Sequence, residues 1–130
     1  MPDKKKKVLI IDDEKNLVAL VALHIRMAGH DPIYALDGEQ GLLSAEEKKP
    51  DVIILDLMLP EIDGLEVCRR IRANPNIKDI PIIMLTAQVG IESRLKGFEM
   101  GADDYVMKPF SPKELVARVN RILARAAHVL

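Results

Sequence analysis

The sequence is poor in cysteine, in aromatic residues and in long hydrophobic runs. Its single cysteine, Cys68, excludes an internal disulfide and is typical of a reducing compartment. Aromatic residues make up 3% of the chain, so a site that stacks a flavin ring is poorly supplied. The apolar runs are far shorter than the roughly 20 residues that span a bilayer, and no signal-peptide pattern follows the amino-terminal lysines. We therefore expect a cytoplasmic protein without membrane contact.

The charge is also nearly balanced, with 19 basic and 20 acidic residues and a net charge of −1. No strong field draws the whole domain to nucleic acid, so we expect no direct nucleic-acid binding. A chain of 130 residues with 48% hydrophobic residues suits one domain with a real core. We expect this single domain to cover residues 1–130, with its core at about residues 6–126.

Strand-like and helix-like segments alternate along the whole chain. Short, β-branched apolar runs predict buried strands, and stretches ended by glycine or proline predict helices. The expected strands are 7–11, 31–35, 51–56, 82–86 and 104–107. The expected helices are 14–28, 39–49, 64–73, 92–100 and 112–125. This alternation predicts a flavodoxin-like α/β fold, a doubly wound five-stranded parallel sheet in the order 2-1-3-4-5 with five helices.

Charged and polar residues stand at the carboxyl ends of these expected strands. Asp12 and Asp13 follow the first strand, Asp56 ends the third, Thr86 ends the fourth, and Lys108 follows the fifth. In the predicted order the first and third strands are neighbours, so the carboxylates converge at one edge of the sheet with an ammonium group beside them.

Such a cluster requires a counter-ion, because like charges at close range raise one or more carboxylate pKa values. Oxygen ligands suit Mg²⁺ or Mn²⁺, and an aspartate left free can act as a nucleophile toward phosphorus. Each residue alone has an ordinary interpretation as a helix cap, a turn former or a solvated lysine. Their joint occurrence at the same strand ends instead predicts a cation site that handles a phosphoryl group.

Four motifs resemble the receiver domain of bacterial two-component response regulators, in particular those of winged-helix transcription regulators. They are VLIIDDE at 8–14, DVIILDLMLP at 51–60 with Asp63-Gly64 after it, PIIMLTA at 81–87 and GADDYVMKPF at 101–110. Together they span nearly all of residues 6–126 in the family's order, and all four in that order form a highly specific signal.

The resemblance implies a role for each residue of the cluster. Asp56 is the expected phosphoacceptor. Asp13 is expected to ligate Mg²⁺ directly, Asp12 through a metal-bound water, and Met58 through its backbone carbonyl. Lys108 is expected to pair with the phosphoryl group. The family is not a conventional enzyme, and the resemblance implies Mg²⁺-dependent self-phosphorylation and self-dephosphorylation.

The resemblance also implies a switch and a phosphodonor. Thr86 and Tyr105 are the expected switch pair, and the bond between Lys108 and Pro109 is expected to be cis. The phosphodonor is expected to be a phosphohistidine on a sensor histidine kinase. Met58 and Gln88, two residues beyond Asp56 and Thr86, carry no carboxylate, which predicts slow to moderate self-dephosphorylation.

Two surfaces are candidates for partners. Outer positions of the first helix, near Val18, Ala19 and Ala22, are candidates for docking the kinase, although small residues also tolerate simple exposure. A set of charges on the last strand and the neighbouring helices resembles the one used for a symmetric, phosphorylation-dependent homodimer. These residues are Lys96, Asp103, Asp104, Glu114, Arg118 and Arg125. Solvated helix charges worth about 0–1 kcal/mol each are the ordinary alternative.

Three other functions share parts of this pattern. A flavodoxin needs a Ser/Thr/Gly-rich phosphate loop where this chain is acidic. An aspartate-nucleophile phosphatase usually has a second aspartate two residues on, where Met58 stands. A degenerate receiver lacks part of the site, which is complete here. The remaining alternative is a stand-alone receiver that acts by protein–protein interaction only.

Overall fold

The structure is a computed structural model that describes residues 5–87, 95 and 99–128. The strands are β1 (Lys7–Ile11), β2 (Asp31–Ala35), β3 (Val52–Asp56), β4 (Ile82–Thr86) and β5 (Asp104–Met107). The helices within these residues are α1 (Lys15–Met27), α2 (Gly38–Lys48), α3 (Gly64–Ala73) and α5 (Pro112–His128). The helix expected at 92–100 lies for the most part outside the described residues.

The strands form one parallel sheet in the order β2-β1-β3-β4-β5, which confirms the predicted topology. β1 and β3 are direct neighbours, with Ile11 opposite Leu55, and Asp56 lies opposite Leu85 of β4. The carboxyl ends of these strands are therefore level with one another. The loops that follow β1 and β3 consequently begin side by side at one edge of the sheet.

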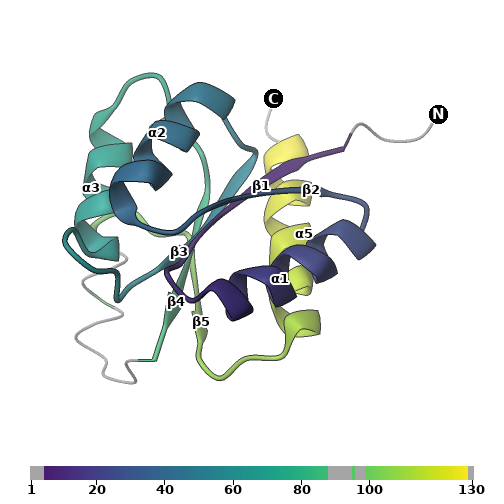
Figure 1. The fold of residues 1–130 in the computed structure, drawn as a ribbon. Helices are drawn as coiled ribbons and strands as arrows, with labels where there is room; N and C mark the ends of the chain where they lie inside the picture. Colours follow the sequence, from purple (N-terminus) through teal and green to yellow (C-terminus); the bar gives the residue numbers. More distant parts are fainter. Residues whose placement is uncertain (1–4, 88–94, 96–98, 129–130) are drawn as a thin grey trace.

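The sheet separates two hydrophobic cores, because successive residues of a strand point to opposite faces. In Figure 1, α1 and α5 cover one face and α2 and α3 cover the other. Leu9 and Ile11 of β1 pack on the α2–α3 side, whereas Val8 and Ile10 pack on the α1–α5 side. Every residue of β3 is buried, as its continuous apolar run predicts for a central strand.

The predicted element bounds are close, with small differences at the helix ends. α5 continues to His128, three residues beyond the predicted end at Arg125. α2 ends at Lys48 because Lys49 adopts a left-handed conformation with φ of 46° directly before Pro50. Among the described residues, no helix combines the length and the apolar character required to cross a bilayer.

Val18 corrects the prediction for the outer surface of the first helix. It is only 4% exposed and belongs to the core on the α1–α5 side, so the expectation that it lies on the outside is wrong. Val18, Val21 and Ile25 are the buried residues of α1. Their spacing of three and four residues places them on one helix face, which turns toward the sheet.

Candidate functional site

The predicted carboxylates lie together at the carboxyl edge of the sheet. Asp12, Asp13 and Asp56 each offer one oxygen, and these three oxygens lie within 4.8 Å of one another. Asp12 and Asp56 are buried, while Asp13 is exposed at the mouth of the site. Three oxygens from hard carboxylate groups at this spacing are a suitable ligand set for Mg²⁺. The geometry therefore fits the predicted cation site.

The Asp56 carboxyl is held in a partly unfavourable environment. Burial, and then the negative charge of Asp12, raises the pKa of Asp56 from 3.8 to about 6. The backbone N–H of Met58 donates to Asp56 Oδ1 at 3.1 Å, and this bond and the charge of Lys108 offset only part of the rise. A positive charge bound at this site would stabilise the ionised form.

The Lys108 ammonium group lies between the two buried carboxylates. Its Nζ is 3.3 Å from Asp12 Oδ2 and 3.4 Å from Asp56 Oδ2. Burial alone would lower the pKa of Lys108, but the charges of Asp12 and Asp56 outweigh burial and raise it. Lys108 therefore places a positive charge beside the carboxylate that the sequence predicts to be phosphorylated.

Glu14 also contacts the site, although the strand-end pattern in the sequence does not mark it as a site residue. Its Oε1 lies 3.7 Å from Lys108 Nζ, and its backbone N–H donates to Asp12 Oδ1 at 2.9 Å. Glu14 precedes α1, but its side chain makes no capping hydrogen bond. The signal available in the sequence was its position directly after Asp12 and Asp13, at the same strand end.

Gly64 brings α3 directly against the backbone of the Asp56 strand. A Cβ atom at Gly64 would lie 2.3 Å from the Asp56 carbonyl oxygen and 2.8 Å from Leu57 Cα. The Gly64 N–H donates to the Leu57 carbonyl at 2.9 Å. A residue with a side chain cannot occupy this position without moving the loop, which explains the glycine after Asp63 in physical terms.

The other predicted site residues occupy neighbouring positions on β4 and β5. Thr86 is fully buried at the end of β4, and its carbonyl accepts a hydrogen bond from the Lys108 N–H at 2.8 Å. Tyr105 on β5 is 8% exposed and packs in the core on the α3 side. The Lys108–Pro109 bond is cis, as expected. The Met58 side chain is 60% exposed and points away from the core.

Four residues of the predicted dimer surface, Asp103, Asp104, Glu114 and Arg118, make contacts within the chain. Arg118 binds the Asp104 carboxylate at 2.9 and 3.0 Å and lies 3.5 Å from Glu114. Asp103 pairs with Arg72 at 2.9 Å. Arg125 is exposed, and Lys96 and Gln88 lie outside the described residues.

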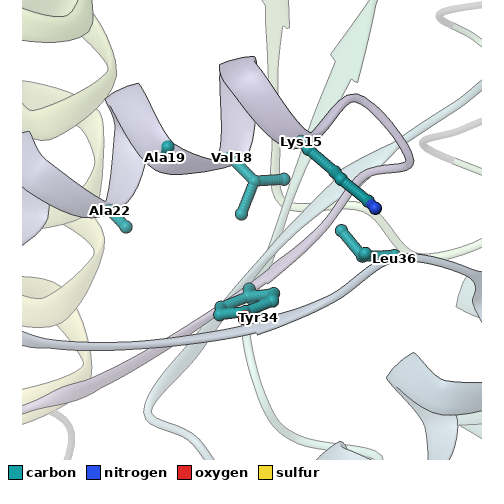
Figure 2. Close-up of a pocket in the computed structure, with 6 residues that line it drawn as sticks. All are labelled: Lys15, Val18, Ala19, Ala22, Tyr34 and Leu36. Carbon is teal, nitrogen blue, oxygen red and sulfur yellow. The ribbon is translucent and has the colours of Figure 1, made fainter.

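An apolar groove lies between α1 and the edge strand β2. Figure 2 shows the small side chains of Ala19 and Ala22 on α1 and the ring of Tyr34 on β2. The groove has a volume of about 380 Å³, and Lys15 and Leu36 also line it. Ala19 is exposed and Ala22 is half-buried, so both remain accessible to a partner.

Comparison with known protein families identifies the family to which the chain belongs. The response regulator receiver domain family matches residues 8–120. The chain is a response regulator receiver domain. In this family the receiver domain is the phosphoacceptor of a two-component signalling system, so the buried carboxylate cluster is the place where that chemistry is expected.

Curated relatives of this receiver domain include two transcription regulators. The alkaline phosphatase synthesis transcriptional regulatory protein PhoP of Bacillus subtilis is 48% identical over 121 residues, which cover 93% of this chain and 50% of PhoP. The DNA-binding dual master transcriptional regulator RpaA of Synechocystis is 45% identical over 95% of this chain and 51% of its own length. The receiver domain thus spans about half the length of the curated relatives it matches.

Solved structures show the same fold. A putative response regulator from Chloroflexus aurantiacus superposes with a TM-score of 0.88 at 45% identity, covering 93% of this chain and 99% of that one. The BeF3-activated DrrB receiver domain has a TM-score of 0.84 at 40% identity, covering the same fractions.

Proposed function

We propose that this receiver domain accepts a phosphoryl group on Asp56 from a phosphohistidine of a sensor histidine kinase. The observation that supports the proposal most strongly is the position of Asp56. Its buried carboxylate lies within reach of two further carboxylates and of the Lys108 ammonium group. One oxygen of Asp56 accepts from the Met58 N–H, and the other faces Lys108, so the group is held in one orientation.

The transfer forms one bond and breaks another. An oxygen of Asp56 attacks phosphorus and forms an acyl phosphate, while the phosphorus–nitrogen bond of the phosphohistidine breaks and its electron pair returns to the imidazole ring. Lys108 neutralises charge on the phosphoryl oxygens, because its Nζ already lies 3.4 Å from Asp56 Oδ2. A small donor such as acetyl phosphate can replace the phosphohistidine, which makes the reaction a self-catalysed one.

The cation would be held by Asp12, Asp13, Asp56 and the backbone carbonyl of Met58. Bound Mg²⁺ would neutralise the transferring phosphoryl group and relieve the repulsion between the carboxylates. Asp12 also accepts from the Glu14 N–H, which fixes its orientation at the site. The role of Met58 rests on the resemblance to the family.

The phosphorylated state would be read at the surface around β5 and α5. Thr86 and Tyr105 would form the switch. Thr86 ends β4, where its carbonyl accepts from the Lys108 N–H, and Tyr105 lies on β5, the strand that leads to Lys108. The output would be a partner protein or a homodimer formed through Lys96, Asp103, Asp104, Glu114, Arg118 and Arg125. The transcription regulators among the relatives favour an output in gene regulation.

Three further features are proposed: where the kinase docks, how far the domain extends and where in the cell it acts. The kinase would dock beside the site on α1, where Ala19 and Ala22 open the groove of Figure 2. Residues 1–130 would form one receiver domain, within which the family match covers 8–120. The domain would act in the cytoplasm, consistent with its single buried thiol, Cys68.

Acetyl phosphate and Mg²⁺ provide the direct test, read by intact mass. The parent chain should gain one phosphoryl group, and Asp56→Asn should gain none. Asp51→Asn is the matched control, because Asp51 precedes the same strand at the opposite edge of the sheet, where it accepts from the Lys7 N–H at 2.8 Å. Full labelling of Asp56→Asn, or loss of labelling in Asp51→Asn alone, would contradict the proposal.

A further inference from the structure

The Arg72 side chain joins three segments of the chain at the amino edge of the sheet. Its guanidinium donates five hydrogen bonds, two of them to the Gly101 carbonyl at 2.8 and 3.0 Å. The others reach the carbonyls of Lys78 at 2.7 Å and Ile80 at 2.6 Å and the Asp103 carboxylate at 2.9 Å. The five N–H groups of a guanidinium lie in one plane at fixed angles, so these hydrogen bonds hold Arg72 and its acceptors in one relative orientation.

The segment that Arg72 binds is shaped around it. Gly101 has a φ of 102°, and a Cβ atom there would lie 2.8 Å from Arg72 Nε and 2.9 Å from Arg72 Cγ. The Asp103 carboxylate that pairs with Arg72 also accepts from the Ile82 N–H at 2.8 Å. The Asp103 N–H in turn donates to the Ile82 carbonyl at 2.8 Å. Residues 101–103 are thus fixed both to α3 and to the start of β4.

This attachment matters because β5 begins at the next residue. Within the described part of the chain, β5 is an edge strand of four residues that pairs with β4 alone. At its far end the Lys108 N–H donates to the Thr86 carbonyl, and the Lys108 ammonium reaches Asp56. Tyr105 and Val106 are buried and help to set the register of β5, and in a strand this short, with hydrogen bonds along one side, the contacts at its two ends add to that effect.

We propose that Arg72 is a positioning residue for Lys108: it fixes the amino end of β5 so that the carboxyl end presents the ammonium group to Asp56. The inference rests on the proposed phosphorylation of Asp56 and deepens it. Asp103, which the sequence pattern places on a dimer surface, thus also makes a contact within the chain. The predicted cation ligands stand at the carboxyl ends of β1 and β3 or directly after them, so displacing β5 should slow transfer of the phosphoryl group without weakening cation binding.

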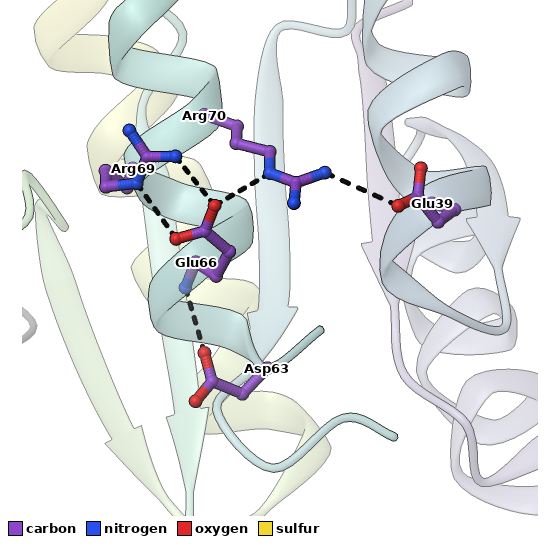
Figure 3. Close-up of polar contacts among 5 residues, drawn as sticks. All are labelled: Glu39, Asp63, Glu66, Arg69 and Arg70. Carbon is purple, nitrogen blue, oxygen red and sulfur yellow. Dashed lines mark hydrogen bonds and ion pairs between the residues drawn. The ribbon is translucent and has the colours of Figure 1, made fainter. Parts of the chain in front are cut away.

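The same helix supplies a matched control. Figure 3 shows Arg69 and Arg70 on α3, both directed at Glu66, with Arg70 also reaching Glu39 on α2. Arg69 binds Glu66 at 2.7 and 2.9 Å and is exposed. Arg69→Gln therefore removes an arginine and its ion pair from α3 without touching the segment before β5.

The experiment compares Arg72→Gln, Arg72→Lys and Arg69→Gln with the parent chain. Two quantities are measured for each: Mg²⁺ affinity by calorimetry, and the rate of phosphorylation by acetyl phosphate at saturating Mg²⁺. Arg72→Gln should bind Mg²⁺ at least as tightly as the parent, because a displaced Lys108 competes less with the cation, and should lose about tenfold to a hundredfold in rate, as misplaced reacting groups do. Arg69→Gln should match the parent in both. Arg72→Lys should recover only part of the rate, because one ammonium group cannot span four acceptors.

Several results would overturn the inference. They are a parental rate in Arg72→Gln, equal losses of Mg²⁺ affinity and rate, or full activity in Arg72→Lys. If Arg72→Gln does not fold, Asp103→Asn replaces it, since its amide oxygen still accepts from the Ile82 N–H, and the same split with a smaller loss of rate is expected.

Amide hydrogen exchange tests the role of Arg72 independently of the phosphorylation of Asp56. The Lys108 N–H, which donates to Thr86, should exchange faster in Arg72→Gln than in Arg69→Gln, whether or not any phosphoryl group is transferred. An unlabelled parent chain would contradict the phosphorylation of Asp56, whereas equal exchange in the two variants would contradict the role of Arg72.

Discussion

Replacing Asp56 by asparagine should make the metal-free domain more stable at neutral pH. Burial and the charge of Asp12 raise the pKa of Asp56 from 3.8 to about 6, so its ionised form is disfavoured in the folded state. A tenfold change in proton affinity is worth about 1.4 kcal/mol, and the raised pKa therefore corresponds to about 3 kcal/mol at pH 7. Asparagine carries no charge, so Asp56→Asn should increase the free energy of unfolding by up to about 3 kcal/mol.

The sign of the pKa change defines the pH range of the effect. The pKa of Asp56 is raised on folding. Between pH 3.8 and about 6, Asp56 is therefore mostly protonated in the folded parent and mostly ionised in the unfolded chain. The stabilisation that protonation of Asp56 gives to the folded parent is lost as the pH rises through that interval. The advantage of Asp56→Asn should consequently be absent below about pH 4 and complete by about pH 7.

Urea unfolding in the presence of EDTA, at a series of pH values, measures this difference directly. Adding Mg²⁺ should then stabilise the parent more than the variant, because the variant lacks one ligand of the cation. An Asp56→Asn chain that is no more stable than the parent at neutral pH would refute the reasoning. So would an advantage of the same size at pH 4 and pH 7.

Other substitutions test separate parts of the site. Lys108→Met removes the ammonium group 3.4 Å from Asp56, which should raise Mg²⁺ affinity on the order of tenfold, measured by calorimetry; weaker Mg²⁺ binding would contradict the shared electrostatic site. Gly64→Ala places a methyl group against the Asp56 carbonyl and should lower the free energy of unfolding by about 1–3 kcal/mol, measured in urea; an unchanged midpoint would contradict the close approach. Ala22→Glu should slow transfer from the kinase while sparing labelling by acetyl phosphate, and equal losses in the two reactions would exclude docking at α1.

The sequence was sufficient to predict the strands and the cluster at their ends. β3 is buried at every position, so its run of apolar residues was unambiguous, and the order of β1 and β3 followed from strict alternation. Parallel strands then place Asp12 and Asp56 at one edge without any choice of side-chain conformation. The site could be predicted because it depends on strand ends and topology alone.

Contacts between side chains far apart in the sequence were not predictable in the same way. Arg72 was a basic residue among others in RRIRA, and nothing local indicated that it binds Gly101 and Asp103. Val18 is expected outside because residues 17–23 are apolar on every side, so periodicity alone does not indicate which face meets the sheet. Asp103 was placed on a dimer surface from its sequence pattern, but its contact with Arg72 required the tertiary structure.

Chemical trapping of the acyl phosphate would show directly which residue is phosphorylated. After reaction with acetyl phosphate and Mg²⁺, borohydride reduces an aspartyl phosphate to homoserine, and peptide mass spectrometry locates the change. We predict that the modified residue is Asp56 alone, in the peptide that carries β3, with Asp12 and Asp13 unchanged. Modification of Asp12 or Asp13 instead, or no modification under conditions where the folded domain binds Mg²⁺, would contradict the assignment of Asp56 as the phosphoacceptor.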